Sequence, residues 1–249
     1  MRRRTGTIMD TVMTMTTNLS ITGQDLLRVL AWFSPSFPVG AFSYSHGIEF
    51  VVEAGLIDDR DGLIEWVDGA VTRGSGRVDA ALFCAAYDAV TNSSDVDLLW
   101  ALERGDTMRA TCELAGESIG QGEAFLATIR TTCPHAGLDR LAALAGDEQR
   151  RLAYPVAVGA AVAAHGVPAS VALPAYLHGL AANMISAGVR LIPLGQTDGQ
   201  RAIAALKPVI LEAAEAAFTR PRGDLGSAAP MIDWASMQHE TQYTRLFRS

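Results

Sequence analysis

The sequence predicts an all-α protein: a single-domain bundle of about eight to ten helices that pack through small residues. Apolar residues recur at intervals of three and four through several segments, which is the period of a helix face. Alternating runs of β-branched residues, which are typical of strands, are nearly absent. The 249 residues are 49% hydrophobic and only 19% charged, so the chain can bury one sizeable core.

The first residues of the chain do not have the pattern of a secretory signal. Arg2, Arg3 and Arg4 precede a run of threonines, but no apolar stretch of the length that a secretory signal requires follows them. We therefore interpret residues 1–22 as a disordered N-terminal extension and residues 23–249 as the helical domain. No unbroken apolar run of about 20 residues occurs elsewhere, so no membrane span is expected.

The number and spacing of the cysteines indicate the redox state of the compartment in which the protein folds. Cys84, Cys112 and Cys133 are odd in number and widely spaced, and no CxxC pair occurs. This pattern indicates neither a disulfide framework nor a thiolate zinc site. A reducing compartment fits best, and we expect the protein in the cytoplasm.

The first third of the chain has the pattern of four helices. Their expected ranges are 24–33, 43–54, 61–70 and 79–89. Pro35 and Pro38 break the chain between the first two, because proline disfavours helical geometry in the residue before it. Gly55 is expected to end the second helix as its C-cap, and residues 73–76 are expected to form a loop.

The clearest helical periodicity lies between residues 108 and 126. Apolar and small residues are spaced 4, 3, 4, 3 and 4 apart, at Met108, Cys112, Ala115, Ile119, Gly122 and Leu126. This spacing places one stripe along one side of a helix, and its small residues would allow another helix to approach closely. Arg109, Glu113 and Glu117 are expected on a different face, with pairing between residues four apart.

The second half of the chain also has the pattern of helices. Residues 154–165 and 175–188 are rich in alanine, valine and glycine, so both are expected to be buried helices with tight packing. Residues 200–218 place their apolar side chains on one side of a last long helix. A turn-rich link over residues 221–230 and a short tail over residues 232–249 complete the chain.

Composition and motifs exclude several classes of function. The formal net charge of −7 argues against nucleic-acid binding, which needs clustered lysines and arginines. Lys207 is the only lysine, and no G-x-x-x-x-G-K-[ST] motif contains it, so a nucleotide-hydrolysing site is excluded. We assign no catalytic residue and expect no cofactor.

Two segments approach hydrolase motifs without completing them. Residues 43–47 resemble the G-x-S-x-G elbow, but Ser43 replaces the first glycine, and the strand and sheet that the elbow needs are not expected. A helix cap is the simpler role for Ser43 or Ser45. Residues 239–243 nearly match H-E-x-x-H, but Tyr243 replaces the second zinc ligand. A helical hydrolase that uses Ser45 remains a distant alternative.

The histidines could bind a metal only across an oligomer. None of the five forms a pair at metal-ligand spacing; they are His46, His135, His165, His178 and His239. A homo-oligomer could bring two copies together at a symmetry axis. His46 and His239 are therefore weak candidates for nickel ligands.

The end of the chain concentrates residue types that dominate protein interfaces. Tyr243, Arg245, Phe247 and Arg248 combine aromatic rings and guanidinium groups, with Leu246 among them. Chain ends usually fray unless they dock. Composition alone leaves open whether this segment binds a partner or packs on its own core.

Three stretches, in order and with fitting spacing, resemble the UreF family of urease accessory proteins. They are residues 34–49 (SPSFPVGAFSYSHGIE), residues 186–200 (SAGVRLIPLGQTDGQ) and residues 236–249 (SMQHETQYTRLFRS). The resemblance covers about residues 26–249. It implies an all-helical, cytoplasmic protein, commonly a homodimer, with no catalytic activity of its own.

The resemblance also implies partners. Members are expected to bridge the urease accessory proteins D (also called H) and G, of which G carries the GTPase, and to support GTP-dependent nickel insertion into apo-urease. The candidate partner-binding residues are Pro38, Phe42, Tyr44, Ser45, Glu49, Gln196, Tyr243, Arg245, Leu246, Phe247 and Arg248. The main alternative is a metallochaperone that binds nickel directly.

Overall fold

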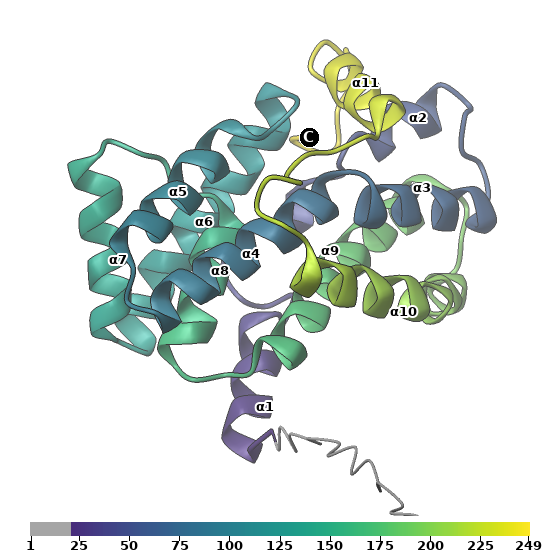
Figure 1. The fold of residues 1–249 in the computed structure, drawn as a ribbon. Coiled ribbons are helices and arrows are strands. Elements are labelled where there is room, and N and C mark those ends of the chain that lie inside the picture. Colours follow the sequence, from purple (N-terminus) through teal and green to yellow (C-terminus); the bar gives the residue numbers. More distant parts are fainter. Residues whose placement is uncertain (1–20) are drawn as a thin grey trace, which may run out of the picture.

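The computed structural model describes residues 21–249, and every regular element in that range is helical (Figure 1). The expected all-α class with a single domain is confirmed. The extension expected over residues 1–22 lies almost wholly outside the described residues, and Thr22 already caps the first helix through a hydrogen bond with Asp25. The elements are α1 (Gly23–Trp32), the 3-10 helix η1 (Ala41–Ser43), α2 (Ile48–Glu53), α3 (Arg60–Thr72), α4 (Ser75–Thr91), α5 (Asp95–Thr107), α6 (Cys112–Thr132), α7 (Ala136–Asp147), α8 (Tyr154–Ala164), α9 (Ala169–Leu191), α10 (Gln196–Thr219) and α11 (Pro230–His239).

Helix α8 forms the centre of the bundle. Every residue from Pro155 to Val162 is buried, so this helix is apolar on all sides, as expected for a helix enclosed by others. It packs chiefly between α4 and α6. At 11 residues it is far shorter than a membrane span, and no helix within residues 21–249 has the length and apolarity to cross a membrane.

Glycines allow the central helices to approach one another closely, which confirms the expected packing through small residues. A Cβ atom at Gly159 of α8 would lie 2.3 Å from the Phe83 carbonyl oxygen of α4. At Gly122 of α6 it would lie 2.1 Å from the carbonyl oxygen of Leu152. Backbone atoms cannot move aside as a flexible side chain can, so both positions require glycine.

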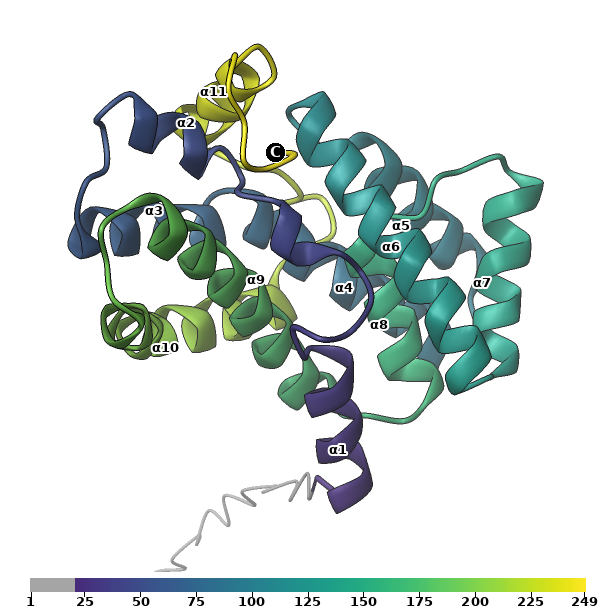
Figure 2. The ribbon, with the colours of Figure 1, turned by 180° about the vertical axis from the view of Figure 1, so that it is seen from behind.

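Helices α9 and α10 pack together and cover α3 on one side of the molecule (Figures 1 and 2). Both extend beyond their expected ranges, and each has a proline in its interior, Pro174 in α9 and Pro208 in α10. The segment between α1 and α2 runs along this side, where η1 lies against α9. The long helix α9 therefore supports the segment that carries the first signature stretch.

The helix expected over residues 43–54 is wrong in its first half. His46 and Gly47 adopt left-handed backbone angles, with φ of 54° and 78°, which stop a helix from running through them. Tyr44 is extended, and α2 begins only at Ile48. Gly55 does follow the helix end with a positive φ, as expected for a glycine at that position.

The helix expected over residues 108–126 begins later, and only Ile119, Gly122 and Leu126 of its expected stripe are buried. Met108 ends α5, and Thr111 caps α6 by accepting the Leu114 amide. The buried side of α6 is formed by Leu114, Glu117, Ser118, Ile119, Gln121, Gly122, Phe125, Leu126 and Ile129, whereas Cys112 is exposed. Arg109, Glu113 and Glu117 were expected to pair with one another four residues apart, and this expectation is wrong, because their ion-pair partners come from other segments of the chain.

Three helices were not expected. α5 buries four residues and α7 only two, so each has only a short apolar stripe. α11 begins with Pro230 at its first turn, where proline is tolerated because the N–H has no intrahelical partner. The expected link, residues 221–230, therefore leads into helix α11, and the first part of the expected tail, residues 232–249, is helical.

The link between α10 and α11 lies along α4 (Figure 1). The Ala228 amide donates to the Arg73 carbonyl at 2.8 Å. Arg77 donates to the Gly226 carbonyl at 3.1 Å and pairs with Asp224 at 2.7 Å. These contacts fix the link to the bundle and so position α11 against α2.

Candidate functional site

The C-terminal tail, residues 240–249, is bound to the segment before and within α2. The buried carboxylate of Glu49 accepts the backbone amides of Leu246 at 2.6 Å and Phe247 at 2.9 Å. Ser45 donates both its amide and its hydroxyl to the main-chain oxygen of Ser249, each at 2.5 Å. The end of the tail is therefore part of the folded core.

Helix α11 and the tail share a second set of contacts, centred on His239. This side chain has no exposed surface, and its Nδ1 lies 2.7 Å from Glu113 Oε2 while its Nε2 lies 3.1 Å from Glu49 Oε2. Arg245 donates to the other oxygen of Glu113 at 2.8 Å. His239 therefore joins α11 to both α2 and α6.

Glu117 of α6 forms the third part of this arrangement. Its Oε1 lies 2.9 Å from His46 Nε2 and accepts Gln121 Nε2 at 2.9 Å, while its Oε2 accepts the Ser249 hydroxyl at 2.9 Å. Burial would lower the pKa of His46, but the Glu117 carboxylate outweighs it, so the pKa lies above its ordinary value. Glu117 therefore favours the charged imidazolium.

We refer to Glu49, Glu113, Glu117, His46 and His239 together as the carboxylate cluster. Its members come from α2, α6, α11 and the turn before α2, and each carboxylate receives more than one donor. A buried carboxylate is tolerated only when several donors replace the water that it has lost. The cluster thus joins three parts of the chain that are distant in sequence: the region of α2, helix α6 and helix α11.

A second buried ion pair lies beside the cluster. Arg109 donates to Asp79 at 2.5 Å and to Ser118 at 3.0 Å, and Tyr176 donates its hydroxyl to Asp79 at 2.7 Å. Burial and the neighbouring Asp79 carboxylate raise the pKa of Tyr176 well above its ordinary value, so the phenol stays protonated. These contacts connect α4, α6 and α9.

Three of the expected partner-binding residues are buried within this arrangement. Ser45, Glu49 and Phe247 are at most 6% exposed, and all three hold the tail in place. Their side chains are therefore not part of the accessible surface. Composition left open whether the tail binds a partner or packs on its own core. These three residues pack on the core.

Other residues of the expected set are exposed around the docked tail. Phe42, Tyr243 and Leu246 present their side chains to solvent. Arg190 of α9 joins two of these regions, because it donates to the Phe42 carbonyl at 2.9 Å and lies over the Phe247 ring at 4.3 Å. Phe42 and the tail therefore lie near one another.

The remaining expected residues take no part in the cluster through their side chains. Pro38 and Gln196 are exposed, and no hydrogen bond or ion pair joins either to the tail among the residues described. Tyr44 is half-buried and accepts Asn183 Nδ2 at its carbonyl, 3.3 Å away. Arg248 is exposed and donates only its backbone amide, to the Ser43 carbonyl at 2.8 Å.

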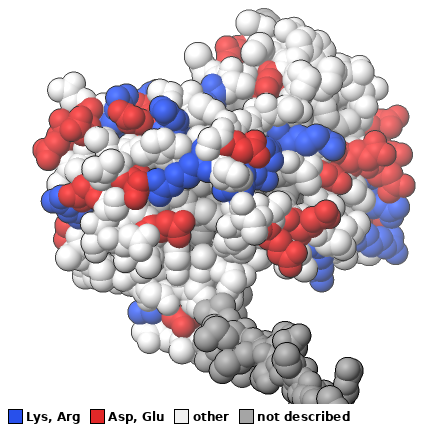
Figure 3. All heavy atoms as spheres, in the orientation of Figure 1, with Lys and Arg blue, Asp and Glu red and all other residues white. Residues whose placement is uncertain are grey.

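Helix α11 adds exposed apolar residues that the sequence did not single out. Met231, Trp234 and Met237 follow one another at three-residue intervals and are 40–55% exposed, while Ile232, Ala235 and His239 are buried. The Trp234 ring also packs edge-on against Phe50 of α2, with the ring centroids 5.2 Å apart. In Figure 3 the surface in the region of α11 carries few charged groups, whereas acidic and basic groups gather in a band across the middle of the same face. We refer to these three exposed side chains of α11, together with Tyr243 and Leu246 of the tail, as the apolar corner.

The candidate nickel ligands, His46 and His239, and the candidate nucleophile, Ser45, already have ion-pair or hydrogen-bond partners within the protein. Both nitrogens of His239, and Nε2 of His46, contact carboxylates, and Ser45 is buried with its hydroxyl bound to Ser249. Within residues 21–249, no three histidine, cysteine or carboxylate groups are placed to hold a metal ion. Ser45 has no hydrogen bond with a histidine, so the geometry of an activated serine is not present there.

The sequence interpretation missed the buried Glu117 and the mostly buried Glu113 as members of the site. The buried side of α6 includes Ile119, Gly122 and Leu126 of the expected stripe, but it also includes Leu114, Phe125 and Ile129, which the stripe left out. The stripe therefore located only part of the buried face, and Glu117 lies in the part that it omitted.

Comparisons with known proteins agree with the resemblance seen in the sequence. The model of the UreF family matches residues 57–207. A urease accessory protein UreF of Rhodopseudomonas palustris is 46% identical over 224 residues, which cover 90% of this chain and 92% of that protein. Similar proteins of the same name occur in Magnetococcus marinus, with 44% identity over 90% of this chain and 97% of the relative, and in Bradyrhizobium diazoefficiens, with 43% identity over 95% of this chain and 100% of the relative.

Proposed function

The chain belongs to the UreF family of urease accessory proteins, and on this premise we propose that it is a non-catalytic scaffold for urease maturation. In this proposal it bridges the accessory proteins D (or H) and G in the cytoplasm and supports GTP-dependent nickel insertion into apo-urease. The scaffold acts as a homodimer. It contributes binding surfaces and carries out no chemical step.

The observation that carries the proposal is the apolar corner formed by α11 and the tail. Trp234, Met237, Tyr243 and Leu246 expose large apolar or aromatic side chains there, and such residues are enriched at binding hot spots. The three-residue spacing along α11 suits an amphipathic helix that fits a partner's groove. Exposed apolar surface of this kind is typical of an interaction site.

The carboxylate cluster makes this corner rigid. Leu246 is fixed through its backbone amide to Glu49, so its side chain is presented without a cost in backbone freedom on binding. His239 fixes the end of α11 in the same way. A surface that is already ordered binds more tightly than one that must fold on contact.

Partner binding can be tested without disturbing the fold. Replacing Tyr243 and Leu246 together by alanine (Tyr243→Ala, Leu246→Ala) removes exposed side chains and keeps the backbone hydrogen bond to Glu49. Loss of one or two true anchors should cost at least about 2 kcal/mol of binding, or roughly thirtyfold in affinity. Val96→Ala on α5 is the matched control, because Val96 is also exposed but lies on a different helix.

The assay combines the purified chain with the D (or H) and G proteins and follows the three by size-exclusion chromatography. We expect G to co-elute with D (or H) only when this chain is present, and the double variant to lose at least one partner while melting like the wild type. Co-elution of D (or H) with G in the absence of the chain would contradict bridging. Unchanged affinity of the double variant would show that the corner is not the binding surface.

The absence of catalysis is tested separately. The chain should release no phosphate from GTP, because it has no P-loop motif. Turnover that persists through repurification and follows the protein peak would refute this. Calorimetric titration with nickel tests the metallochaperone alternative, which sub-micromolar binding to the chain alone would support.

A further inference from the structure

The imidazole of His239 has a hydrogen-bond geometry that only its charged form can satisfy. The side chain has no exposed surface, and its Nδ1 lies 2.7 Å from Glu113 Oε2 while its Nε2 lies 3.1 Å from Glu49 Oε2. An ionised carboxylate accepts hydrogen bonds and donates none, and a neutral imidazole has one N–H whereas the imidazolium has two. In either neutral tautomer, one ring nitrogen would therefore direct its lone pair at a carboxylate oxygen.

Two carboxylates and one guanidinium surround this imidazole. Glu49 faces His239 from α2 and Glu113 faces it from α6, and the tail contributes Arg245, which pairs with Glu113 at 2.8 Å. Within residues 21–249, no ion pair joins His239 to any other group. Arg245 balances one of the two carboxylates, so the other remains for the imidazolium. Both carboxylates are largely buried, so salt screens their attraction for a positive charge only weakly.

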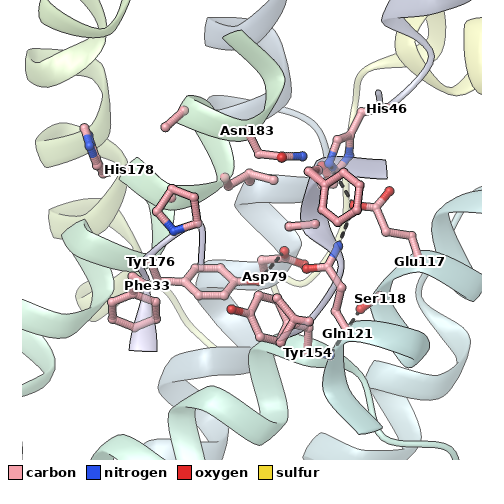
Figure 4. A pocket seen from close by; sticks show the side chains of 18 of the residues that line it. Phe33, His46, Asp79, Glu117, Ser118, Gln121, Tyr154, Tyr176, His178 and Asn183 are labelled. Atoms are coloured by element: carbon pink, nitrogen blue, oxygen red, sulfur yellow. Dashed lines mark hydrogen bonds and ion pairs between the residues drawn. The ribbon is translucent and has the colours of Figure 1, made fainter. Parts of the chain in front are cut away.

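His46, in the wall of the pocket shown in Figure 4, is a second imidazole beside a carboxylate. Its Nε2 lies 2.9 Å from Glu117 Oε1, and the other oxygen of Glu117 accepts the Ser249 hydroxyl at 2.9 Å. Burial opposes the charge and so does Arg109, but the carboxylates of Glu117 and Asp79 outweigh them, so the pKa of this imidazole lies above its ordinary value. The charged form is therefore favoured here as well.

The three carboxylates of the cluster are balanced only while both imidazoles are charged. Their positive partners are Arg245 and the two histidines. A histidine that lost its proton would leave one carboxylate without a positive partner in a largely buried site, and an unpaired buried charge is costly. Only His239 lies on α11, so only this imidazole would leave the carboxylates if α11 moved away from the bundle.

The carboxylate of Glu49 joins the docking of α11 to the docking of the tail. Its Oε2 accepts the Phe247 amide at 2.9 Å and is the same oxygen that faces His239 Nε2. Its Oε1 accepts the Leu246 amide at 2.6 Å. Separation of α11 from α2 would therefore disturb both amide contacts, and the tail would be released together with the helix.

We propose that the docking of α11 and the tail, residues 230–249, takes up a proton at His239, so that rising pH releases this segment from α2 and α6. The effect on partner binding rests on the proposed function, because this segment carries most of the apolar corner. The release itself is a property of the chain alone and can be measured without a partner. Arg245 and the tail amides do not titrate near neutral pH, so they hold the tail equally across this range.

The sign and the size of the effect follow from proton linkage. A histidine in the released segment titrates near pH 6.5. Below that pH the imidazole is charged in both states, so docking does not depend on pH. Above it only the docked state holds the proton, and the docking constant falls by about tenfold for each pH unit until the docked imidazole also loses its proton.

Hydrogen exchange of the full-length protein measures the release directly. The protection of the Leu246 and Phe247 amides, taken relative to the intrinsic exchange rate at each pH, should fall by at least about tenfold between pH 6.5 and pH 8.5. Nitrogen-15 NMR should show that both ring nitrogens of His239 carry protons at pH 7. Constant protection over this range, or a neutral His239 ring at pH 7, would overturn the proposal.

Two histidine variants assign the effect to a residue. His239→Gln removes the titrating group, so protection of the tail amides should be lower than in the wild type and should lose most of its pH dependence. His178→Gln is the matched control, because His178 is exposed on α9 and has no side-chain hydrogen bond or ion pair within residues 21–249. Wild-type pH dependence that persists in His239→Gln, or that is lost in His178→Gln, would overturn the assignment. If His239→Gln does not fold, the two wild-type measurements decide the question.

Partner binding separates this proposal from the scaffold function. If the segment is released with rising pH while the affinity for the D (or H) and G proteins stays constant, the release is supported and the apolar corner is not the binding surface. If the Tyr243→Ala, Leu246→Ala variant loses a partner while the tail amides keep the same protection at every pH, the corner is supported and the proton-linked release is wrong.

Discussion

Replacing Glu49 by glutamine should release the tail, because Glu49 is the acceptor for three donors. Its carboxylate receives the amides of Leu246 and Phe247 and lies 3.1 Å from His239 Nε2. Glutamine has almost the same shape but keeps only one acceptor oxygen, and its amide group would face donors with another donor. Glu49→Gln therefore tests the charge and the acceptor pattern with little change in volume.

The magnitude follows from the contacts that are lost. A hydrogen bond to a charged group contributes about 1.5–3 kcal/mol, and the substitution removes or weakens at least one of the two backbone bonds. We expect the free energy of unfolding to fall by about 3 kcal/mol. For a chain of this length, 1 kcal/mol corresponds to roughly 2–4 °C, so Tm should fall by about 6–12 °C.

Urea denaturation followed by circular dichroism measures the loss of stability, and hydrogen exchange locates it. The amides of Leu246 and Phe247 should exchange much faster in Glu49→Gln than in the wild type, and trypsin should cleave sooner after Arg245. Glu65→Gln on α3 is the matched control, because Glu65 is exposed, makes no side-chain hydrogen bond within residues 21–249 and should change stability by no more than about 0.5 kcal/mol. Equal stability and equal protection of the tail amides in Glu49→Gln would refute the role assigned to this carboxylate.

Three further predictions follow from the buried groups and the helix packing. Because the pKa of His46 is raised in the folded protein, its pair with Glu117 stabilises the fold below pH 6.5, and this contribution is lost as pH rises through the folded pKa. The stability advantage of wild type over His46→Asn, measured by urea denaturation, should therefore shrink between pH 6 and pH 9, whereas a constant difference would contradict the pairing. Gly122→Ala should lower stability by about 1–3 kcal/mol, since its Cβ would lie 2.1 Å from the Leu152 carbonyl oxygen, and a wild-type melting curve would show that the helices can separate. Gly116→Ala, with free space around its Cβ, should raise stability by up to about 1 kcal/mol, and a loss would show that its surroundings are more crowded than described.

The sequence determined the helical class, the packing through small residues and the family. Periodicity predicts a helix wherever apolar residues recur every three or four positions, and α10 satisfies that condition over most of its length. Helix α8, which is apolar on all sides, was expected from its alanine, valine and glycine content. The three signature stretches identified the family because a long match in order is specific even where its physical role is unknown. Neither kind of inference depends on knowing which segments meet in space.

The tertiary structure alone decided the role of the tail and the orientation of α6. Glu49, Glu113 and Glu117 are charged, so a pattern based on polarity places them in water. Glu49 and Glu117 are buried, and Glu113 is mostly buried, only because His239, the tail and His46 reach them. The contacts with His239 and the tail span from 126 to 198 residues of sequence. A carboxylate can be buried away from water only if distant segments supply hydrogen-bond donors to it, and a local sequence pattern does not show which donors those are.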